Sequence, residues 1–222
     1  RPFYLLAAIF SALSVGLWAL QFTGLLPRAY LGGPLWHAHE MLFGYALAVV
    51  AGFLFTAVRN WSGRPTPTGA TLAAIAALWV AGRVLVLTPW DVAAAVANTA
   101  FPLAVAWGIG APLWRARNER NYFFVGLLVL MSAGVAYIHL TALGALEAPP
   151  WAGVQLGLDV ILFIMAVMAG RVVPMFTNNG APGARARRSS HVERAALGGV
   201  LMLLVADLFR LSGALLAVHA GV

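Results

Sequence analysis

The sequence contains no cysteine and no lysine among its 222 residues. Without cysteine the chain has no disulfides, no thiolate metal ligands, no iron–sulfur cluster and no cysteine nucleophile. Any metal or haem site must therefore be built from histidine, carboxylate, methionine or backbone groups. All 14 basic residues are arginine, and the formal net charge is +7.

Charged residues are also scarce, at 9% of the chain, whereas 62% of the residues are hydrophobic. Soluble domains have about 25% charged and about 45–50% apolar residues. The composition therefore excludes a soluble enzyme, a secreted disulfide scaffold and a disordered tail. One membrane span with its connection needs roughly 30 residues, so the length allows about seven spans. We predict an all-α, polytopic transmembrane helical bundle.

Apolar runs separated by polar or Pro/Gly-rich breaks give the positions of the spans. The predicted spans are 3–26, 35–58, 69–88, 92–114, 121–146, 151–176 and 195–219. Pro34 and Pro89 stand where helix boundaries are expected. No linker or low-complexity tract divides the sequence, so we predict a single transmembrane domain over residues 1–222.

The arginines alternate between the two sides of the predicted membrane. The breaks after the second, fourth and sixth spans hold nine of them: Arg59, Arg64, Arg115, Arg117, Arg120, Arg185, Arg187, Arg188 and Arg194. The breaks after the first, third and fifth spans hold one, Arg28. The positive-inside rule therefore predicts a cytoplasmic N-terminus and cytoplasmic arginine-rich breaks. The basic charge is interpreted as a topology signal, and we expect no nucleic-acid partner.

Ionisable side chains within spans are costly, at about 2.5–3.5 kcal/mol near mid-helix, and therefore mark candidate functional sites. With the predicted orientation, one group lies in the outer half of the membrane: His37, His39, Glu40, Arg83, Asn98, His139, Asp159 and His219. Four of the five histidines thus share one leaflet, as a bound cofactor would require. The alternative is that each ring bonds a carbonyl or a headgroup, which we favour for His219.

The segment Trp36-His-Ala-His-Glu-Met41 is the most distinctive local feature. Residues two apart in a helix differ by about 200° around its axis, so His37 and His39 should point to opposite faces. They would then serve two centres, or one would be a ligand and the other structural. Glu40 follows His37 by three residues and shares its face, where it could orient that ring or ligate a metal itself.

These residues make up the predicted site. Neutral imidazole is the commonest metal ligand and the usual axial ligand of b-type haem, which needs no cysteine attachment. His37, His39 and His139 are candidate cofactor ligands, and His37, His39 and Glu40 are candidate metal ligands. Arg83 has no partner nearby in the sequence and could hold a haem propionate through paired hydrogen bonds.

Four segments resemble one known family in the same order along most of the chain. They are R-P-F-Y-L-L at 1–6, W-H-A-H-E-M-L-F-G at 36–44, G-F-L-F-T-A-V-R-N-W-S-G-R-P at 52–65 and G-R-V-V-P-M-F-T at 170–177. Together they are similar to NnrS proteins, which are bacterial inner-membrane proteins containing haem and copper and associated with the response to nitric oxide. Family members usually have further spans, so we expect the chain to be the N-terminal part of a longer protein.

The resemblance implies haem b and copper as cofactors, nitric oxide or a related small molecule as partner, and an electron donor that it does not identify. The leading hypothesis is binding or redox handling of nitric oxide or its products. The alternative is a transporter or metal-handling permease that uses the same histidines as a pathway. Transport predicts paired broken helices, and only Pro174, which predicts a kink or an end after Gly170, suggests one.

Overall fold

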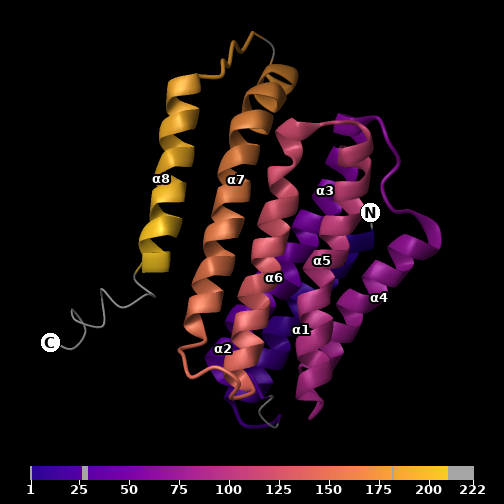
Figure 1. Ribbon diagram of the computed structural model, residues 1–222, viewed down its shortest axis with the longest axis vertical. Helices are drawn as coiled ribbons and strands as arrows, with labels where there is room; N and C mark the ends of the chain where they lie inside the picture. Colours follow the sequence, from indigo (N-terminus) through magenta and orange to yellow (C-terminus); the bar gives the residue numbers. More distant parts are fainter. Residues whose placement is uncertain (1, 27–29, 182, 210–222) are drawn as a thin grey trace, which may run out of the picture. The chain divides into compact units, whose positions relative to one another are not determined.

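The computed structural model describes residues 2–26, 30–181 and 183–209, and the regular elements among them are all helices (Figure 1). The predicted all-α fold class is confirmed. In chain order the elements are α1 (Pro2–Phe22), α2 (Gly33–His39), the π-helix η1 (Glu40–Ala46), α3 (Leu47–Ser62), α4 (Gly69–Leu85), α5 (Asp91–Arg115), the 3-10 helix η2 (Glu119–Asn121), α6 (Phe123–Ala142), α7 (Trp151–Gly180) and α8 (Ser190–Phe209).

The chain forms two compact units, Arg1–Gly157 and Leu158–Val222. Helix α7 begins in the first unit and ends in the second. The division into two compact units does not test whether residues 1–222 form a single transmembrane domain, which remains a prediction.

Five helices of the described chain are long and apolar enough to span a membrane. They are Pro2–Phe22, Gly33–Ser62 (the continuous helix α2–η1–α3), Asp91–Arg115, Glu119–Ala142 and Trp151–Gly180. Each coincides with a predicted span, and the protein is a membrane protein. Helix α4 is apolar but shorter than predicted, because the chain turns at Leu87 and Thr88. The predicted span 195–219 corresponds to α8 as far as Phe209, and its remainder lies outside the described residues.

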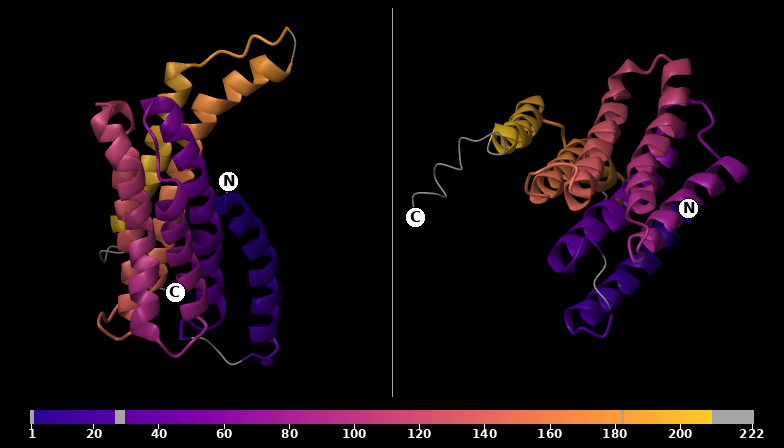
Figure 2. Two further views of the ribbon diagram at one scale, coloured as in Figure 1. Left: turned by 90° about the vertical axis from the view of Figure 1, so that its right-hand side faces the viewer. Right: turned by 60° about the horizontal axis from the view of Figure 1, so that its bottom comes forward.

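Within the first unit, α1 packs against α3 and η1, and α5 packs against α3, α4 and α6. Figure 2 shows α1 at one side of this unit, along the continuous helix α2–η1–α3. Phe3 of α1 lies between Phe55 of α3 and Phe101 of α5, with both ring-centre distances 5.8 Å. These large side chains form the apolar core that fixes the spacing of the helices.

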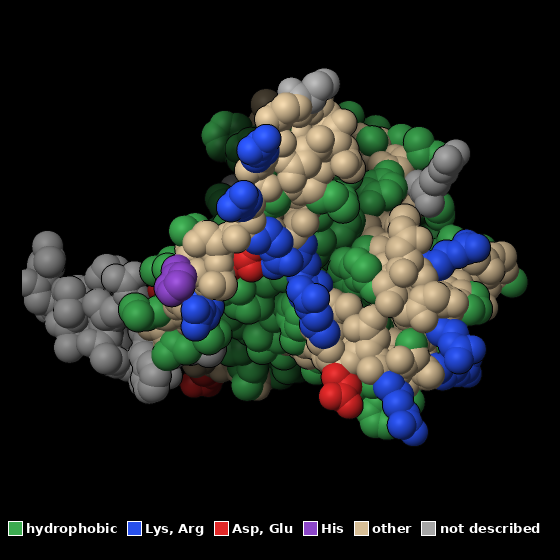
Figure 3. Space-filling view, turned by 90° about the horizontal axis from the view of Figure 1, so that it is seen from above, with side chains coloured by type: hydrophobic (Ala, Val, Ile, Leu, Met, Phe, Trp, Pro, Cys, Tyr) green, Lys and Arg blue, Asp and Glu red, His purple; other side chains and the backbone are tan. Residues whose placement is uncertain are grey.

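The connections of the first unit alternate between its two ends, as the arginine pattern predicts. In Figure 1 the α3–α4 and α5–α6 connections lie at the upper end, and the α4–α5 and α6–α7 connections lie at the lower end. The arginines Arg59, Arg64, Arg115, Arg117 and Arg120 belong to the upper end and are exposed. Figure 3 looks onto that end and shows arginine side chains gathered on it.

The second unit contains the rest of α7 and α8. Helix α7 continues through Pro174 to Gly180, a few residues beyond the predicted span 151–176. A proline removes one helical donor, and a helix in a membrane protein tolerates this when neighbouring groups satisfy the freed carbonyl. In the connection before α8, Arg188 forms a bidentate ion pair with Glu193 of the first turn of α8, at 2.7 and 2.6 Å.

Candidate functional site

The site begins at the junction between α2 and η1. His39 is the last residue of α2 and Glu40 is the first of η1, so the ring and the carboxylate stand where α-helix changes to π-helix. A π-helical turn is wider than an α-helical turn and frequently occurs at functional sites. The wider turn changes the direction in which the side chains project, which a regular helix would have fixed.

Glu40 links a histidine ring to an arginine in the interior of the first unit. The His39 Nδ1–H group donates to Glu40 Oε1 at 2.8 Å, and Arg83 Nη1 donates to Glu40 Oε2 at 2.8 Å. The exposed fractions of His39, Glu40 and Arg83 are 0%, 1% and 8%. A buried carboxylate needs such partners, because an unpaired charge in an apolar interior is strongly destabilising. Both carboxylate oxygens of Glu40 are therefore engaged.

Arg83 is held by several groups besides Glu40. Its Nη2 donates to the side-chain oxygen of Asn98, whose own amide group donates to the Ala94 carbonyl at 2.8 Å. The guanidinium also lies over the rings of Phe10 and Trp79, at 5.8 and 5.9 Å from their centres. Arg83, which has no partner nearby in the sequence, thus finds its partners on η1 and α5.

Gly44 makes room for this cluster. A Cβ atom at Gly44 would lie 2.5 Å from Arg83 Nη1 and 2.7 Å from the Phe10 ring. The Gly44 carbonyl also accepts a hydrogen bond from Trp79 Nε1 at 3.0 Å. Because Gly44 has no side chain, Arg83 can reach Glu40 past this position of η1.

His139 of α6 lies against His39. The two ring centres are 5.0 Å apart and the planes cross at 80°, so the rings are in edge-to-face contact. His139 is 1% exposed, and its Nδ1 is hydrogen-bonded to the Tyr30 hydroxyl. Both rings are held through Nδ1, and both Nε2 atoms are buried without a hydrogen-bond partner among the described residues. The two histidine rings are in contact, and each has one buried ring nitrogen that is not used in a hydrogen bond. Each of these nitrogens could donate a lone pair to a bound metal ion.

Tyr30, in the turn before α2, was not predicted as a site residue. Burial, together with the negative charges of Asp91 and Glu40, raises the pKa of its hydroxyl above the usual 10.0. The hydroxyl therefore stays protonated over the physiological range beside His139. Its sequence neighbourhood contains no motif that pairs it with a histidine 109 positions away.

His37 lies on a different side of the helix from His39, as predicted. Its ring stacks on Trp18 of α1, with ring centres 4.2 Å apart and planes at 20°, and its Nδ1 is buried without a partner in the described part of the chain. Glu40 bonds the adjacent His39 ring instead of His37. The expectation that Glu40 orients His37 is therefore wrong, because the two carboxylate oxygens of Glu40 are taken by His39 and by Arg83 of α4.

Asp159, another predicted residue, is buried in the second unit, and His219 lies outside the described residues. The fifth histidine, His191, was not predicted as a site residue and is exposed at the start of α8. Among the described residues there is no group of three or more histidine, aspartate or glutamate side chains placed to hold one metal ion. The structure thus brings together His39, Glu40, Arg83 and His139, and places His37 against Trp18.

Comparison with known proteins gives one result. The sequence model of a family described as NnrS protein matches residues 1–222. No curated protein and no solved structure matches the chain.

Proposed function

Because the chain belongs to the NnrS family, we propose that it is a multi-pass protein of the bacterial inner membrane that carries haem and copper and acts in the response to nitric oxide. The five long apolar helices support the membrane location. The observation that carries the proposal is the pair of buried, unpartnered Nε2 atoms on His39 and His139.

The hydrogen bonds of the two rings fit metal binding. A metal-ligating histidine almost always donates its other ring N–H to a carboxylate, carbonyl or similar group, which fixes the tautomer and the ring orientation. His39 has this arrangement, because its Nδ1–H donates to Glu40 and leaves a lone pair on Nε2. With a metal at His139 Nε2, the Nδ1–H of that ring donates to the Tyr30 oxygen.

Copper is the metal that we assign to this pair. Imidazole nitrogen suits copper among the first-row metals, and the described residues supply no third histidine or carboxylate that would complete a larger shell. Glu40 has both oxygens engaged by His39 and Arg83, which makes it a positioning residue for His39 and not a ligand. Copper bound here would supply a one-electron redox centre within the membrane.

The same geometry argues against haem between His39 and His139. The two rings are in direct contact, so a porphyrin plane has no space between them. We therefore propose His37, which lies away from the pair with an unpartnered Nδ1, as the candidate haem ligand in this chain. Arg83 has both terminal nitrogens engaged by Glu40 and Asn98, so its role is to hold Glu40 and it is not proposed as a propionate anchor.

The test is metal analysis and visible spectroscopy of the full chain purified in detergent, oxidised and reduced, with and without nitric oxide. His39→Ala and His139→Ala should each remove most of the copper and leave the haem absorption in place. His37→Ala should shift or remove the haem absorption and leave the copper. His191→Ala is the matched control, since that ring is exposed, and it should change neither.

Two results would contradict the assignment. Unchanged copper in both His39→Ala and His139→Ala would exclude this pair as the copper site. A wild-type protein without haem or copper would instead favour the alternative of a permease or transporter. Against that alternative stands α7, which stays helical through Pro174 to Gly180 and is not interrupted by an unwound segment.

A further inference from the structure

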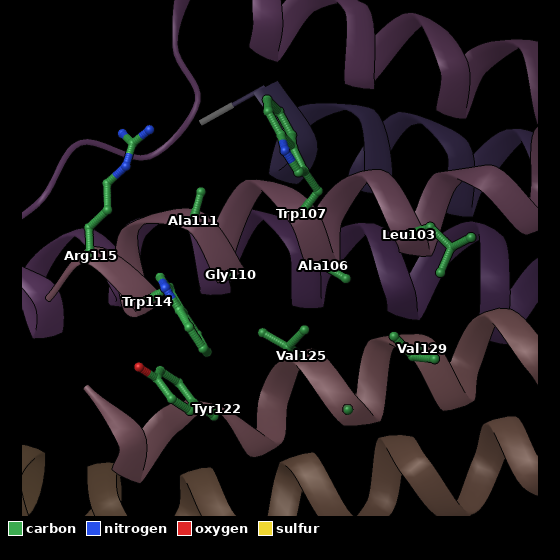
Figure 4. A pocket seen from close by; sticks show the side chains of 11 residues that line it. Leu103, Ala106, Trp107, Gly110, Ala111, Trp114, Arg115, Tyr122, Val125 and Val129 are labelled. Atoms are coloured by element: carbon green, nitrogen blue, oxygen red, sulfur yellow. The ribbon is translucent and has the colours of Figure 1, made fainter. Parts of the chain in front are cut away.

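A pocket lies between α5 and α6, at the end of the first unit opposite to the histidine pair (Figure 4). Its volume is about 660 Å³, and apolar side chains make up most of its wall. Figure 4 shows Arg115, Trp114 and Tyr122 at one end and Leu103 and Val129 at the other. The pocket is therefore an elongated, apolar groove with a polar end.

The groove has the length of one membrane leaflet. Twelve residues separate Leu103 from Arg115 on α5, and at about 1.5 Å per residue this is a distance of about 18 Å. Half of a hydrocarbon core of about 30 Å is about 15 Å. The apolar part thus matches one acyl chain in depth, and Arg115 stands at the level of the lipid headgroups.

The polar end of the groove is positively charged. Arg115, Arg117 and Arg120 are all exposed there, and Glu119 is the acidic residue of the same connection. Arg115 forms no salt bridge with any other part of the described chain. On the predicted orientation this end faces the cytoplasmic leaflet, where basic pockets between membrane helices bind anionic headgroups.

Two glycines keep the groove open. A Cβ atom at Gly126 would meet nothing within 4 Å, and one at Gly110 would make only ordinary contact with Val125 at 3.5 Å. The stacked rings of Trp114 and Tyr122, 5.8 Å apart, form the wall next to Arg115. We propose that this groove binds an anionic phospholipid, with one acyl chain between α5 and α6 and the phosphate on Arg115.

The experiment measures thermal unfolding of the full chain in detergent, after removal of bound lipid, with added phosphatidylglycerol, phosphatidylcholine or inorganic phosphate. Phosphatidylglycerol should stabilise the wild type at lower concentration than phosphatidylcholine, and inorganic phosphate should have no effect. Arg115→Gln should need about tenfold more phosphatidylglycerol, since a hydrogen bond to a charged group is lost. Gly126→Leu fills the groove and should abolish the response to both lipids.

Two matched variants serve as controls. Arg64→Gln removes an exposed arginine of the α3–α4 connection, and Gly16→Leu adds a side chain where α1 has open space. Both should respond to phosphatidylglycerol like the wild type. The proposal is overturned if Arg115→Gln and Gly126→Leu respond normally, if inorganic phosphate reproduces the effect, or if Gly126→Leu changes only the oligomeric state.

Discussion

At the scale of single residues, Glu40 determines how the side chains of the site are oriented. Its carboxylate joins the His39 ring to the Arg83 guanidinium, and all three groups are buried. A buried ion pair adds little compared with an apolar pair, but removing one partner leaves an uncompensated charge. The protein retains the ion pair, we infer, because it fixes the orientation of His39 and leaves Nε2 free.

Arg83→Met should destabilise the protein by about 3–5 kcal/mol, because it leaves the Glu40 charge buried with one partner fewer. The double variant Glu40→Gln with Arg83→Met should be more stable than Arg83→Met alone, since the charge is then gone. The measurement is the free energy of unfolding of the purified protein in mixed micelles. Arg188→Met breaks an exposed pair with Glu193 and serves as the control, with little change expected. Equal losses in both arginine variants would contradict the interpretation.

Gly44→Ala should be destabilising by about 1–3 kcal/mol, the usual cost of overpacking. The added Cβ would stand 2.5 Å from Arg83 Nη1, in a cluster whose members cannot retreat without losing hydrogen bonds. Gly126→Ala is the control, because a Cβ there meets nothing and alanine favours the helix. Thermal unfolding in detergent measures both, and a Gly44→Ala protein as stable as the control would show that the cluster is loosely packed.

At the scale of elements, the sequence predicted the helices better than the site. Long apolar runs require helices in a membrane, because the backbone must satisfy its own hydrogen bonds there. The two-residue spacing of His37 and His39 also predicted correctly that their rings point to different sides of the helix. The π-helix η1 could not be predicted, since the 3.6-residue period was assumed to continue. Glu40 was assigned to the wrong histidine because its second partner, Arg83, lies on another helix and leaves no local signal.

The contact between His39 and His139 depends on the packing of α6 beside the continuous helix α2–η1–α3. The sequence indicated that both rings lie in one leaflet, but a leaflet is a layer and does not determine which helices are neighbours. The partners of Arg83 were missed for the same reason, because Glu40 is 43 residues away and Asn98 is on another helix. Such long-range pairs follow from tertiary packing and leave no local signal.

Tyr30, in the turn before α2, should make the stability of the folded protein depend on pH. Burial raises the pKa of its hydroxyl above 10.0, so the folded protein favours the protonated form. Its contribution to stability is fully present below about pH 10 and is lost as the pH rises toward the higher folded-state pKa. The difference in unfolding free energy between wild type and Tyr30→Phe should therefore shrink above about pH 10.

Chemical unfolding of both proteins at several pH values from neutral to alkaline would measure this difference. At neutral pH, Tyr30→Phe should be less stable by roughly 0.5–1.5 kcal/mol, the value of a typical hydrogen bond. A difference between the two proteins that stays constant across the alkaline range would indicate that Tyr30 ionises in the folded protein as it does in the unfolded chain.

At the scale of the whole molecule, the orientation in the membrane decides what each end of the first unit faces. The histidine pair and the lipid groove lie at opposite ends, and the arginines stand at the groove end. The positive-inside rule predicts that this end faces the cytoplasm. The metal site would then be nearer the outer surface, and the lipid groove would be in the inner leaflet.

The absence of cysteine makes this orientation directly measurable, since a single introduced thiol is the sole target of a maleimide. Ser189→Cys and Thr68→Cys lie on the predicted cytoplasmic side, whereas Ala148→Cys lies in the α6–α7 connection on the outer side, and all three positions are exposed. In intact cells a membrane-impermeant maleimide should label Ala148→Cys alone, and permeabilised cells should show all three labelled. The reverse pattern would place the histidine pair near the cytoplasm and the lipid groove in the outer leaflet. The contacts of both sites would remain as described, but nitric oxide and copper would then have to reach the histidine pair from the cytoplasm.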